Sequence, residues 1–217
     1  MLTHRYLIIW DADGCILYSA NVMSNAIDML KNTDFFVKHQ DLDNPTTFKK
    51  FYLNQENQKN PENAILYQTV AESEKLTTLV PDIQDVLKTH YFEQCIVSRA
   101  TNDQHARKLT NNATLLKYIS IEKHFLTNDN QSLKDTFMQR AMENLHYGNE
   151  HCIAIGDSPD DIDAAIRCGI KHRIGFVGVV PKSKKEQITN ELKKHGATYV
   201  AQNPLDLKLY LERNFSR

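Results

Sequence analysis

The feature that most limits the fold of this chain is a short apolar run that ends in two acids and a glycine. The run reads YLIIWDADGCIL over residues 6–17, and its bulky residues 7–10 are typical of a strand buried inside a parallel sheet. Asp11 and Asp13 follow this strand, and Gly14 supplies a turn. Two carboxylates this close repel each other and lose hydration unless a cation or a proton separates them. The alternative is that these acids form only a solvated Asp-Gly turn. The other segments of the sequence must decide between these two interpretations.

The composition is that of an ordinary globular protein, and it excludes several classes. The chain has 217 residues, of which 41% are hydrophobic and 24% charged, and its net charge is −1 with 26 basic and 27 acidic residues. This length allows one domain with a sizeable core, or a core domain plus a small insert. The nearly balanced charge predicts that nucleic acid is not a partner. No apolar run approaches the ~20 residues that a membrane helix needs, so no membrane span is expected.

The cysteines and histidines indicate neither a disulfide framework nor a zinc site. The cysteines occur singly, mostly in or beside apolar runs, as reduced and buried thiols do: Cys15, Cys95, Cys152 and Cys168. The nine histidines are scattered without metal-ligand spacing. The first apolar stretch is also too short for the core of a signal peptide. We therefore expect a cytoplasmic protein, while the sequence leaves delivery outside the producing cell open.

Strands alternate with helices over most of the chain, which predicts an α/β fold with a doubly wound parallel sheet. Strands are predicted at residues 7–10, 95–97, 152–155, 172–180 and 199–201, with another inside 119–126. Helices are predicted at residues 19–30, 81–89, 104–116, 132–145, 160–168, 184–195 and 204–213, the first capped by Ser19 and the fourth by Ser132.

A polar stretch rich in Asn and Gln, residues 31–74, interrupts this alternation. It contains two helical patterns, each led by a proline, and no pattern typical of a buried strand. We therefore predict a small helical insert at residues 18–78, within a core formed by residues 1–17 and 79–217.

Polar side chains follow three of the predicted strands: Asp11 and Asp13, then Ser98, then Asp157 with Asp161. The carboxyl ends of parallel strands share one edge of the sheet, where open α/β sheets bind their ligands. Carboxylates that converge there destabilise one another without a divalent cation, and oxygen ligands select a hard ion such as Mg²⁺. Lys134, at the start of a predicted helix, adds a positive charge. A carboxylate beside a hydroxyl, a lysine and Mg²⁺ describes phosphoryl transfer.

At these positions the chain resembles the phosphatases of the haloacid dehalogenase (HAD) superfamily, and the resemblance covers nearly all of it outside the insert. The family motif D-x-D-G-[TV] matches residues 11–15, with Cys15 where Thr or Val is usual. The apolar strand that ends in Ser or Thr matches 96–98, and G-D-S-x-x-D-I-x-A-A matches 156–165. The lysine that the family places ahead of a helix is best matched by Lys134. The resemblance implies a HAD-like, Rossmann-like core with a small helical cap.

The resemblance also implies an activity, Mg²⁺-dependent hydrolysis of a phosphomonoester through an aspartyl-phosphate. Asp11 would be the nucleophile, and Asp13 would be the general acid that later serves as the base. Mg²⁺ would be bound by the carboxylates of Asp11 and Asp157 and by the backbone carbonyl of Asp13. Because dehalogenases and P-type ATPases of the superfamily lack an acid at the second position, Asp13 indicates a phosphatase or a phosphotransferase.

Four further groups would hold and orient the phosphoryl group, according to the same resemblance. Its oxygens would be bound by Ser98, by the backbone amide of Arg99 and by Lys134. Asp161 would orient Lys134 and the water molecules of the metal. Lys123 is the alternative to Lys134 as the lysine that binds the phosphoryl oxygens. Arg99 is also explained as a surface arginine, and Asp161 as an acid stabilised by the helix dipole.

The substrate stays open on the sequence alone. A phosphorylated small molecule and a phosphoprotein, including one that carries phosphotyrosine, both fit. The aromatic residues Phe51, Tyr52 and Tyr67 of the insert are either substrate contacts or packing residues. Two other functions are alternatives to hydrolysis. Under these alternatives the protein is either a phosphotransferase or mutase of the same superfamily, or a binding module of this fold without turnover.

Overall fold

The computed structural model describes residues 5–89, 91–127 and 133–216, and the chain divides into two compact units. Unit 1 comprises Met1–Tyr18, Leu79–Asn102 and Ala113–Arg217, and unit 2 comprises Ser19–Thr78 and Asp103–Asn112. The sequence assigned the whole range 79–217 to the core. The structure differs for residues 103–112, which group with the insert.

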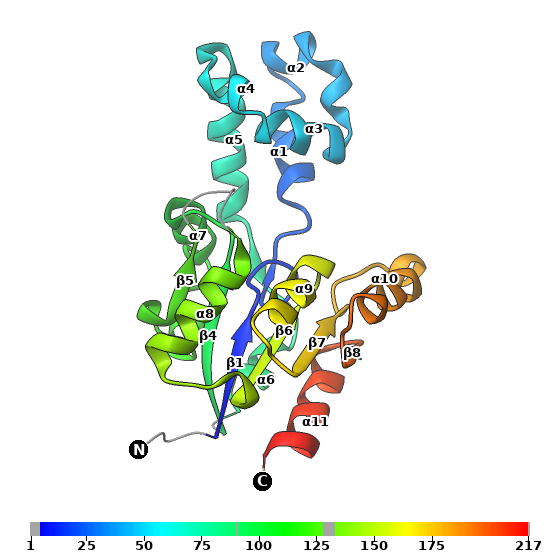
Figure 1. The fold of residues 1–217 in the computed structure, drawn as a ribbon. Helices are drawn as coiled ribbons and strands as arrows, with labels where there is room; N and C mark the ends of the chain where they lie inside the picture. Colours follow the sequence, from blue (N-terminus) through cyan, green and yellow to red (C-terminus); the bar gives the residue numbers. More distant parts are fainter. Residues whose placement is uncertain (1–4, 90, 128–132, 217) are drawn as a thin grey trace. The chain divides into compact units, whose positions relative to one another are not determined.

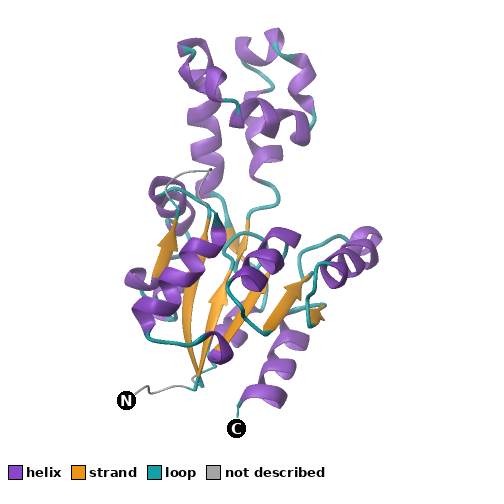
Figure 2. Cartoon of the chain, in the orientation of Figure 1, coloured by secondary structure: helices purple, strands orange, loops and turns teal. Residues whose placement is uncertain are grey.

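Unit 1 contains a six-stranded parallel sheet with the strand order β5-β4-β1-β6-β7-β8, which confirms the predicted doubly wound α/β fold (Figure 2). The strands are β1 (Tyr6–Trp10), β4 (Phe92–Ser98), β5 (His124–Leu126), β6 (Cys152–Gly156), β7 (His172–Phe176) and β8 (Tyr199–Ala201). Two short strands, β2 (Leu17–Tyr18) and β3 (Thr78–Leu79), pair separately.

Helices cover both faces of this sheet (Figure 1). One face carries α8 (Lys134–Leu145), α9 (Pro159–Arg167) and α10 (Lys182–Lys194), and the other carries α6 (Ile83–Leu87) and α11 (Pro204–Phe215). The described residues of this unit also form three short 3₁₀ helices: η3 (Ala113–Lys117), η4 (Ile121–Lys123) and η5 (Asn149–His151). Leu7 and Ile9 of β1 pack with Met138 and Ala164, while Ile8 and Trp10 are equally buried, as expected for a central parallel strand.

The strand order places the end of β1 at a special point of the sheet. From β1 the chain adds β4 and then β5 on one side, and afterwards adds β6, β7 and β8 on the other side. The direction of winding therefore reverses beside β1. In open α/β sheets the crevice at such a reversal, outside the carboxyl ends of the strands, is where ligands bind.

Unit 2 is helical, as the polar stretch predicted. Its elements are α1 (Val22–Leu30), α2 (Asp34–Lys38), η1 (Gln40–Asp43), α3 (Pro45–Leu53), α4 (Gln55–Lys59), η2 (Pro61–Asn63), α5 (Ala64–Lys75) and nearly all of α7 (Asn102–Leu109). The side chains of Asn44, Asn54 and Asn60 each cap one of these helices by accepting backbone N–H groups. These caps account for part of the asparagine content, and the apolar side chains form a separate core around Leu30, Phe48 and Leu66.

The single helix expected at 104–116 is wrong, because α7 ends at Leu109 and only a 3₁₀ turn follows. Asn112 provides the physical reason: its buried side-chain amide donates to the carbonyls of Lys108 and Thr77, at 2.6 and 2.7 Å. It thereby binds the carbonyl that a longer helix would use and ties the end of α7 to the chain beyond α5.

Smaller differences concern the ends of elements. Helix α1 begins at Val22 with Asn21, rather than Ser19, as its N-cap residue. Strand β7 ends at Phe176 instead of residue 180, and the strand expected within 119–126 is limited to His124–Leu126. The helix cap predicted at Ser132 lies outside the described residues.

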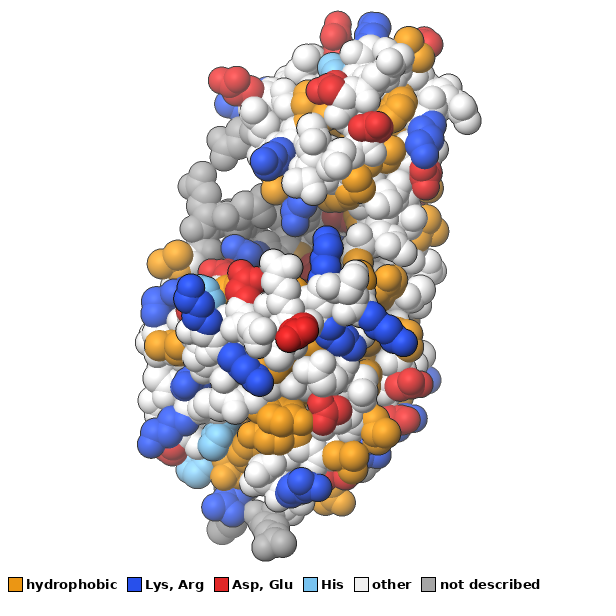
Figure 3. Space-filling view, turned by 90° about the vertical axis from the view of Figure 1, so that its right-hand side faces the viewer, with side chains coloured by type: hydrophobic (Ala, Val, Ile, Leu, Met, Phe, Trp, Pro, Cys, Tyr) orange, Lys and Arg blue, Asp and Glu red, His pale blue; other side chains and the backbone are white. Residues whose placement is uncertain are grey.

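Charges of both signs are distributed over the surface. On the face that Figure 3 draws, Lys and Arg side chains are interspersed with Asp and Glu, so the described side chains form no surface of a single sign there. Among the helices that the structure describes, none is long and apolar enough to cross a membrane.

Candidate active site

Three neighbouring strands bring polar residues to the carboxyl edge of the sheet. Asp11 directly follows β1, Ser98 is the last residue of β4, and Asp157 directly follows β6. Because β1 lies between β4 and β6, these residues share one edge, at the point where the winding reverses. The backbone N–H of Asp11 still donates to Ile155 of β6, at 2.8 Å, so the sheet itself fixes the position of this aspartate.

Gly14, in the turn after Asp11, lies against the carboxylate of Asp157. Gly14 has a φ of +82°, and its N–H donates to the carbonyl of Leu17 at 2.8 Å. A Cβ atom at Gly14 would lie 2.0 Å from Oδ2 of Asp157. Glycine is therefore required here twice, for the left-handed backbone and for the close approach of Asp157.

We expect Gly14→Ala to lower both stability and activity, because the new Cβ strains the turn and displaces the Asp157 carboxylate. The left-handed backbone alone costs about 1–2 kcal/mol of unfolding free energy. Gly169→Ala is the matched control, since Gly169 has a φ of +70° but its nearest neighbour is only the side-chain amide of Asn149. Urea unfolding should detect both substitutions, whereas an assay of any activity that depends on the acids at this edge should detect Gly14→Ala alone. Equal activities of the two variants would contradict this expectation.

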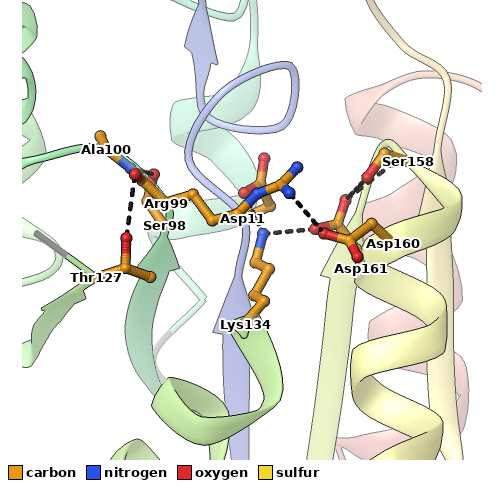
Figure 4. A network of polar contacts seen from close by, with 9 residues as sticks. All are labelled: Asp11, Ser98, Arg99, Ala100, Thr127, Lys134, Ser158, Asp160 and Asp161. Atoms are coloured by element: carbon orange, nitrogen blue, oxygen red, sulfur yellow. Dashed lines mark hydrogen bonds and ion pairs between the residues drawn. The ribbon is translucent and has the colours of Figure 1, made fainter. Parts of the chain in front are cut away.

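Lys134 lies buried between two of the acids (Figure 4). It opens α8, and its side chain is only 2% exposed. Its Nζ donates to Oδ1 of Asp11 and to Oδ1 of Asp161, the latter at 2.5 Å. Burial opposes the positive charge, but the charges of Asp11 and Asp161 outweigh it and raise the pKa of Lys134. Both acids therefore favour the charged form of the lysine.

The competing lysine, Lys123, is placed differently. Its Nζ lies 2.6 Å from Oε1 of Glu93, a residue of β4 five positions before the strand's carboxyl end. Lys134, and not Lys123, contacts Asp11.

Asp161 has two structural roles at once. It accepts from the backbone N–H and the hydroxyl of Ser158, at 3.0 and 2.7 Å, and so completes a capping box at the start of α9. Its other oxygen accepts from Lys134. Burial favours the neutral acid, yet Lys134 and the bonds from Ser158 outweigh burial and lower the pKa of Asp161. Both interpretations of this residue, the helix acid and the partner of Lys134, are therefore present in the geometry.

The loop after β4 is held by a residue that the sequence analysis missed. The hydroxyl of Thr127 donates to the carbonyl of Arg99 at 3.1 Å, and its N–H donates to the carbonyl of Ser98 at 3.1 Å. The hydroxyl of Ser98 accepts from the N–H of Ala100 at 3.2 Å. The signal for Thr127 was present, since it follows an apolar strand as Ser98 does, but β5 is too short to be located from its pattern.

The acids of the site have shifted pKa values because they are buried together. Burial, together with Asp161, Asp157 and Asp13, raises the pKa of Asp11 against the opposing charge of Lys134. Burial and Asp161 likewise raise the pKa of Asp157 to about 7. A single lysine thus leaves the buried carboxylates short of positive charge, which is the environment that favours a divalent cation.

The donor atoms of Asp11, Cys15 and Asp157 lie within 4.8 Å of one another. Burial, with a contribution from Asp157, raises the pKa of the Cys15 thiol well above its usual value. A neutral thiol is a poor ligand for a hard ion, whereas the two carboxylates are good ones. The residues therefore fit Mg²⁺ through their oxygen atoms. Asp13, the other acid of the turn, is half-buried.

The aromatic residues of the insert pack within unit 2. Phe51, Tyr52 and Tyr67 are half-buried against its core, and the hydroxyl of Tyr67 donates to the carbonyl of Tyr52 at 3.3 Å. The rings of Tyr52 and Tyr67 lie 5.2 Å apart. These contacts are sufficient to explain the three residues as packing residues.

Comparison with known proteins identifies the family. A family model described as haloacid dehalogenase-like hydrolase matches residues 8–174. The chain also shares its fold with many solved HAD-type structures, which confirms the predicted HAD-like core. Comparison with curated protein sequences finds no match.

Three of the solved structures illustrate the likeness. A HAD family hydrolase from Deinococcus radiodurans, solved with bound phosphate and sodium, is 14% identical with a TM-score of 0.70, and the match covers 98% of this chain and 97% of that one. A protein from Bacillus subtilis described as a HAD-hydrolase bound to magnesium is 15% identical, with a TM-score of 0.68 and coverage of 96% and 99%. A protein from Thermotoga maritima described as a beta-phosphoglucomutase is 14% identical, with a TM-score of 0.69 and coverage of 97% and 100%. At these identities the likeness shows the fold alone.

Proposed function

The chain belongs to the haloacid dehalogenase-like hydrolase family, and from this premise we propose that it is a Mg²⁺-dependent phosphomonoester hydrolase. One observation carries the proposal: the carboxylate of Asp11, at the switch point of the sheet, is held by the buried Lys134 and faces the carboxylate of Asp157. A carboxylate fixed beside a lysine and a cation-binding acid is suited to attack phosphorus in line.

In the first step, the Asp11 carboxylate attacks the phosphorus atom and the P–O bond to the leaving group breaks. Asp13, two residues along the turn, gives its proton to the leaving oxygen, and an aspartyl-phosphate remains on Asp11. In the second step, water attacks this phosphorus and Asp13 takes the proton of the water. The P–O bond to Asp11 breaks, which regenerates the Asp11 carboxylate and releases inorganic phosphate.

The cation would be held by the carboxylates of Asp11 and Asp157 and by the backbone carbonyl of Asp13. When bound, Mg²⁺ supplies charge neutralisation for the phosphoryl oxygens and for the crowded acids. The raised pKa values of Asp11 and Asp157 support this assignment, because burial and the neighbouring acids outweigh the charge of Lys134 at both carboxylates.

The phosphoryl oxygens would be bound by the Ser98 hydroxyl, the backbone amide of Arg99 and the Nζ of Lys134. Thr127 fixes the backbone of this loop, and Asp161 fixes Lys134. Each proposed contact therefore has a second residue that orients it, which lowers the cost of organising the site in the transition state.

Unit 2 would serve as the cap that shields the reaction from water and selects the substrate. Small phosphorylated molecules and phosphoproteins both remain candidates, including proteins with phosphotyrosine. The four free, buried cysteines support a reducing compartment such as the cytoplasm.

A panel of phosphoesters tests the proposal. Wild-type protein, stripped of metal with EDTA and then supplied with Mg²⁺, should release phosphate from at least one aryl phosphate, sugar phosphate, nucleotide or phosphotyrosine peptide. Activity should fall to background in EDTA and return with Mg²⁺, because the acids then regain their counter-charge. Activity that is unchanged in EDTA would contradict the metal assignment. A complete lack of phosphate release across the panel would refute the hydrolase proposal.

The same assay separates hydrolysis from transfer. An excess of a hydroxyl acceptor competes with water for the aspartyl-phosphate of a phosphotransferase or mutase, and a new phosphoester then forms in place of free phosphate. We expect free phosphate to remain the main product.

A further inference from the structure

An ion pair crosses the carboxyl edge of the sheet above the proposed nucleophile (Figure 4). Arg99 follows the end of β4, and Asp160 lies in the first turn of α9, which follows β6. The Nη1 atom of Arg99 lies 3.2 Å from Oδ2 of Asp160. Since β1 lies between β4 and β6, a link between these two residues passes over the end of β1, where Asp11 is located.

This ion pair differs from the buried one beneath it. The side chain of Arg99 is 54% exposed and that of Asp160 is 43% exposed, whereas Lys134 is enclosed by Asp11 and Asp161. Exposed ion pairs contribute little to stability, so the guanidinium can exchange Asp160 for another anion at small cost. The backbone of Arg99 is meanwhile fixed by Thr127. The structure therefore combines a fixed main chain with a side chain that is free to change its partner.

The partner of Arg99 is a different acid from the partners of Lys134. Lys134 already bonds to Asp11 and Asp161, and a phosphoryl group bound there would meet Lys134 and Ser98 first. The guanidinium instead contacts an acid at the exposed rim. Guanidinium groups bind carboxylates and phosphates through paired N–H donors. An anion carried by the substrate next to its phosphoester would lie within the range of such a group.

We propose that Arg99 is a specificity-determining residue whose guanidinium leaves Asp160 and binds a second anionic group of the substrate, a carboxylate or a second phosphate. This inference rests on the proposed hydrolase function and names the class of substrate: phosphomonoesters with another anion close to the ester. Asp160 is the resting partner that the second anion displaces.

Matched substrate pairs test this. In the first comparison, phenyl phosphate is paired in turn with its ortho, meta and para carboxyphenyl analogues, which tests a carboxylate as the second anion. In the second comparison, propanediol monophosphate is paired with the bisphosphate, which tests a second phosphate. Wild type should favour the doubly anionic member of at least one pair by about tenfold in kcat/KM, the size of one charge-assisted contact. Arg99→Gln should remove that preference, mainly by raising KM for the doubly anionic member.

Two further variants complete the experiment. Arg140→Gln, at an exposed arginine of α8, makes the same change of charge and should keep the preference. Asp160→Asn removes the competing carboxylate and should lower KM for the doubly anionic substrate.

The outcomes are distinct. If Arg99→Gln lowers kcat/KM equally for both members of each pair, Arg99 serves the reacting phosphoryl group, and this result overturns the inference. So would a wild type that hydrolyses both members of each pair equally well. In either case phosphate release itself leaves the hydrolase proposal standing. If wild type releases no phosphate from any substrate, both proposals fail together.

Discussion

Asp11→Asn is expected to lower kcat for phosphate release by at least about 10⁴-fold, which is the size of the loss that removal of a catalytic nucleophile typically causes. Asparagine has nearly the shape of aspartate, and its side-chain oxygen can still accept the bond from Lys134. The amide cannot form an acyl-phosphate that turns over, and it contributes no negative charge to a cation. The effect should therefore appear in kcat with little change in the fold.

Rapid acid quench and mass spectrometry provide the direct measurement. Wild-type protein should carry a phosphate adduct on the peptide that contains Asp11 during turnover, and Asp11→Asn should carry none. Asp163→Asn is the matched control, because its carboxylate contacts His195, the C-cap residue of α10, at 3.1 Å. An adduct on another residue, or full activity in Asp11→Asn, would refute the assignment of the nucleophile.

The meeting of acids at one sheet edge was predictable from sequence because the parallel topology leaves little choice. Once the apolar runs before Asp11, Ser98 and Asp157 are assigned to parallel strands, their ends must share an edge. The winding reversal beside β1 is set by the same strand order. The spacing of Asp157 and Asp161 along the chain was also informative, since a strand, a turn and a capped helix fix their separation.

Other features depend on contacts between residues distant in sequence, and local patterns do not encode those. The choice between Lys123 and Lys134 is decided by the partners Glu93 and Asp11, which tertiary packing supplies. The grouping of residues 103–112 with unit 2 is of the same kind. Arg107 of α7 pairs with the buried Glu74 of α5 at 2.6 Å, an attachment that a helix pattern does not reveal.

Lys134→Met should lower both activity and stability. Methionine fills a similar volume but leaves Asp11 and Asp161 buried without their common partner. Removing one partner of a buried ion pair typically costs about 3–5 kcal/mol of unfolding free energy. Losing one group that stabilises the transferred phosphoryl should also lower kcat by about 10²–10³-fold. Urea unfolding and phosphate release measure the two effects separately.

The loss of stability in Lys134→Met should depend on pH with a definite sign. In wild type, Lys134 and the bonds from Ser158 lower the pKa of Asp161 despite burial. Without the lysine, the pKa of Asp11, which is already raised, rises further and burial also raises that of Asp161, so the folded variant binds protons more tightly than the unfolded chain does. Stability that comes from such raised pKa values is present at low pH and is lost as pH rises, so the variant should be closer to wild type at about pH 5 than at about pH 8. Lys123→Met is the control and should keep its activity, because Lys123 contacts Glu93 instead of Asp11. A Lys134→Met protein with wild-type activity, or with a deficit that shrinks as pH rises, would show that Lys134 does not neutralise these acids.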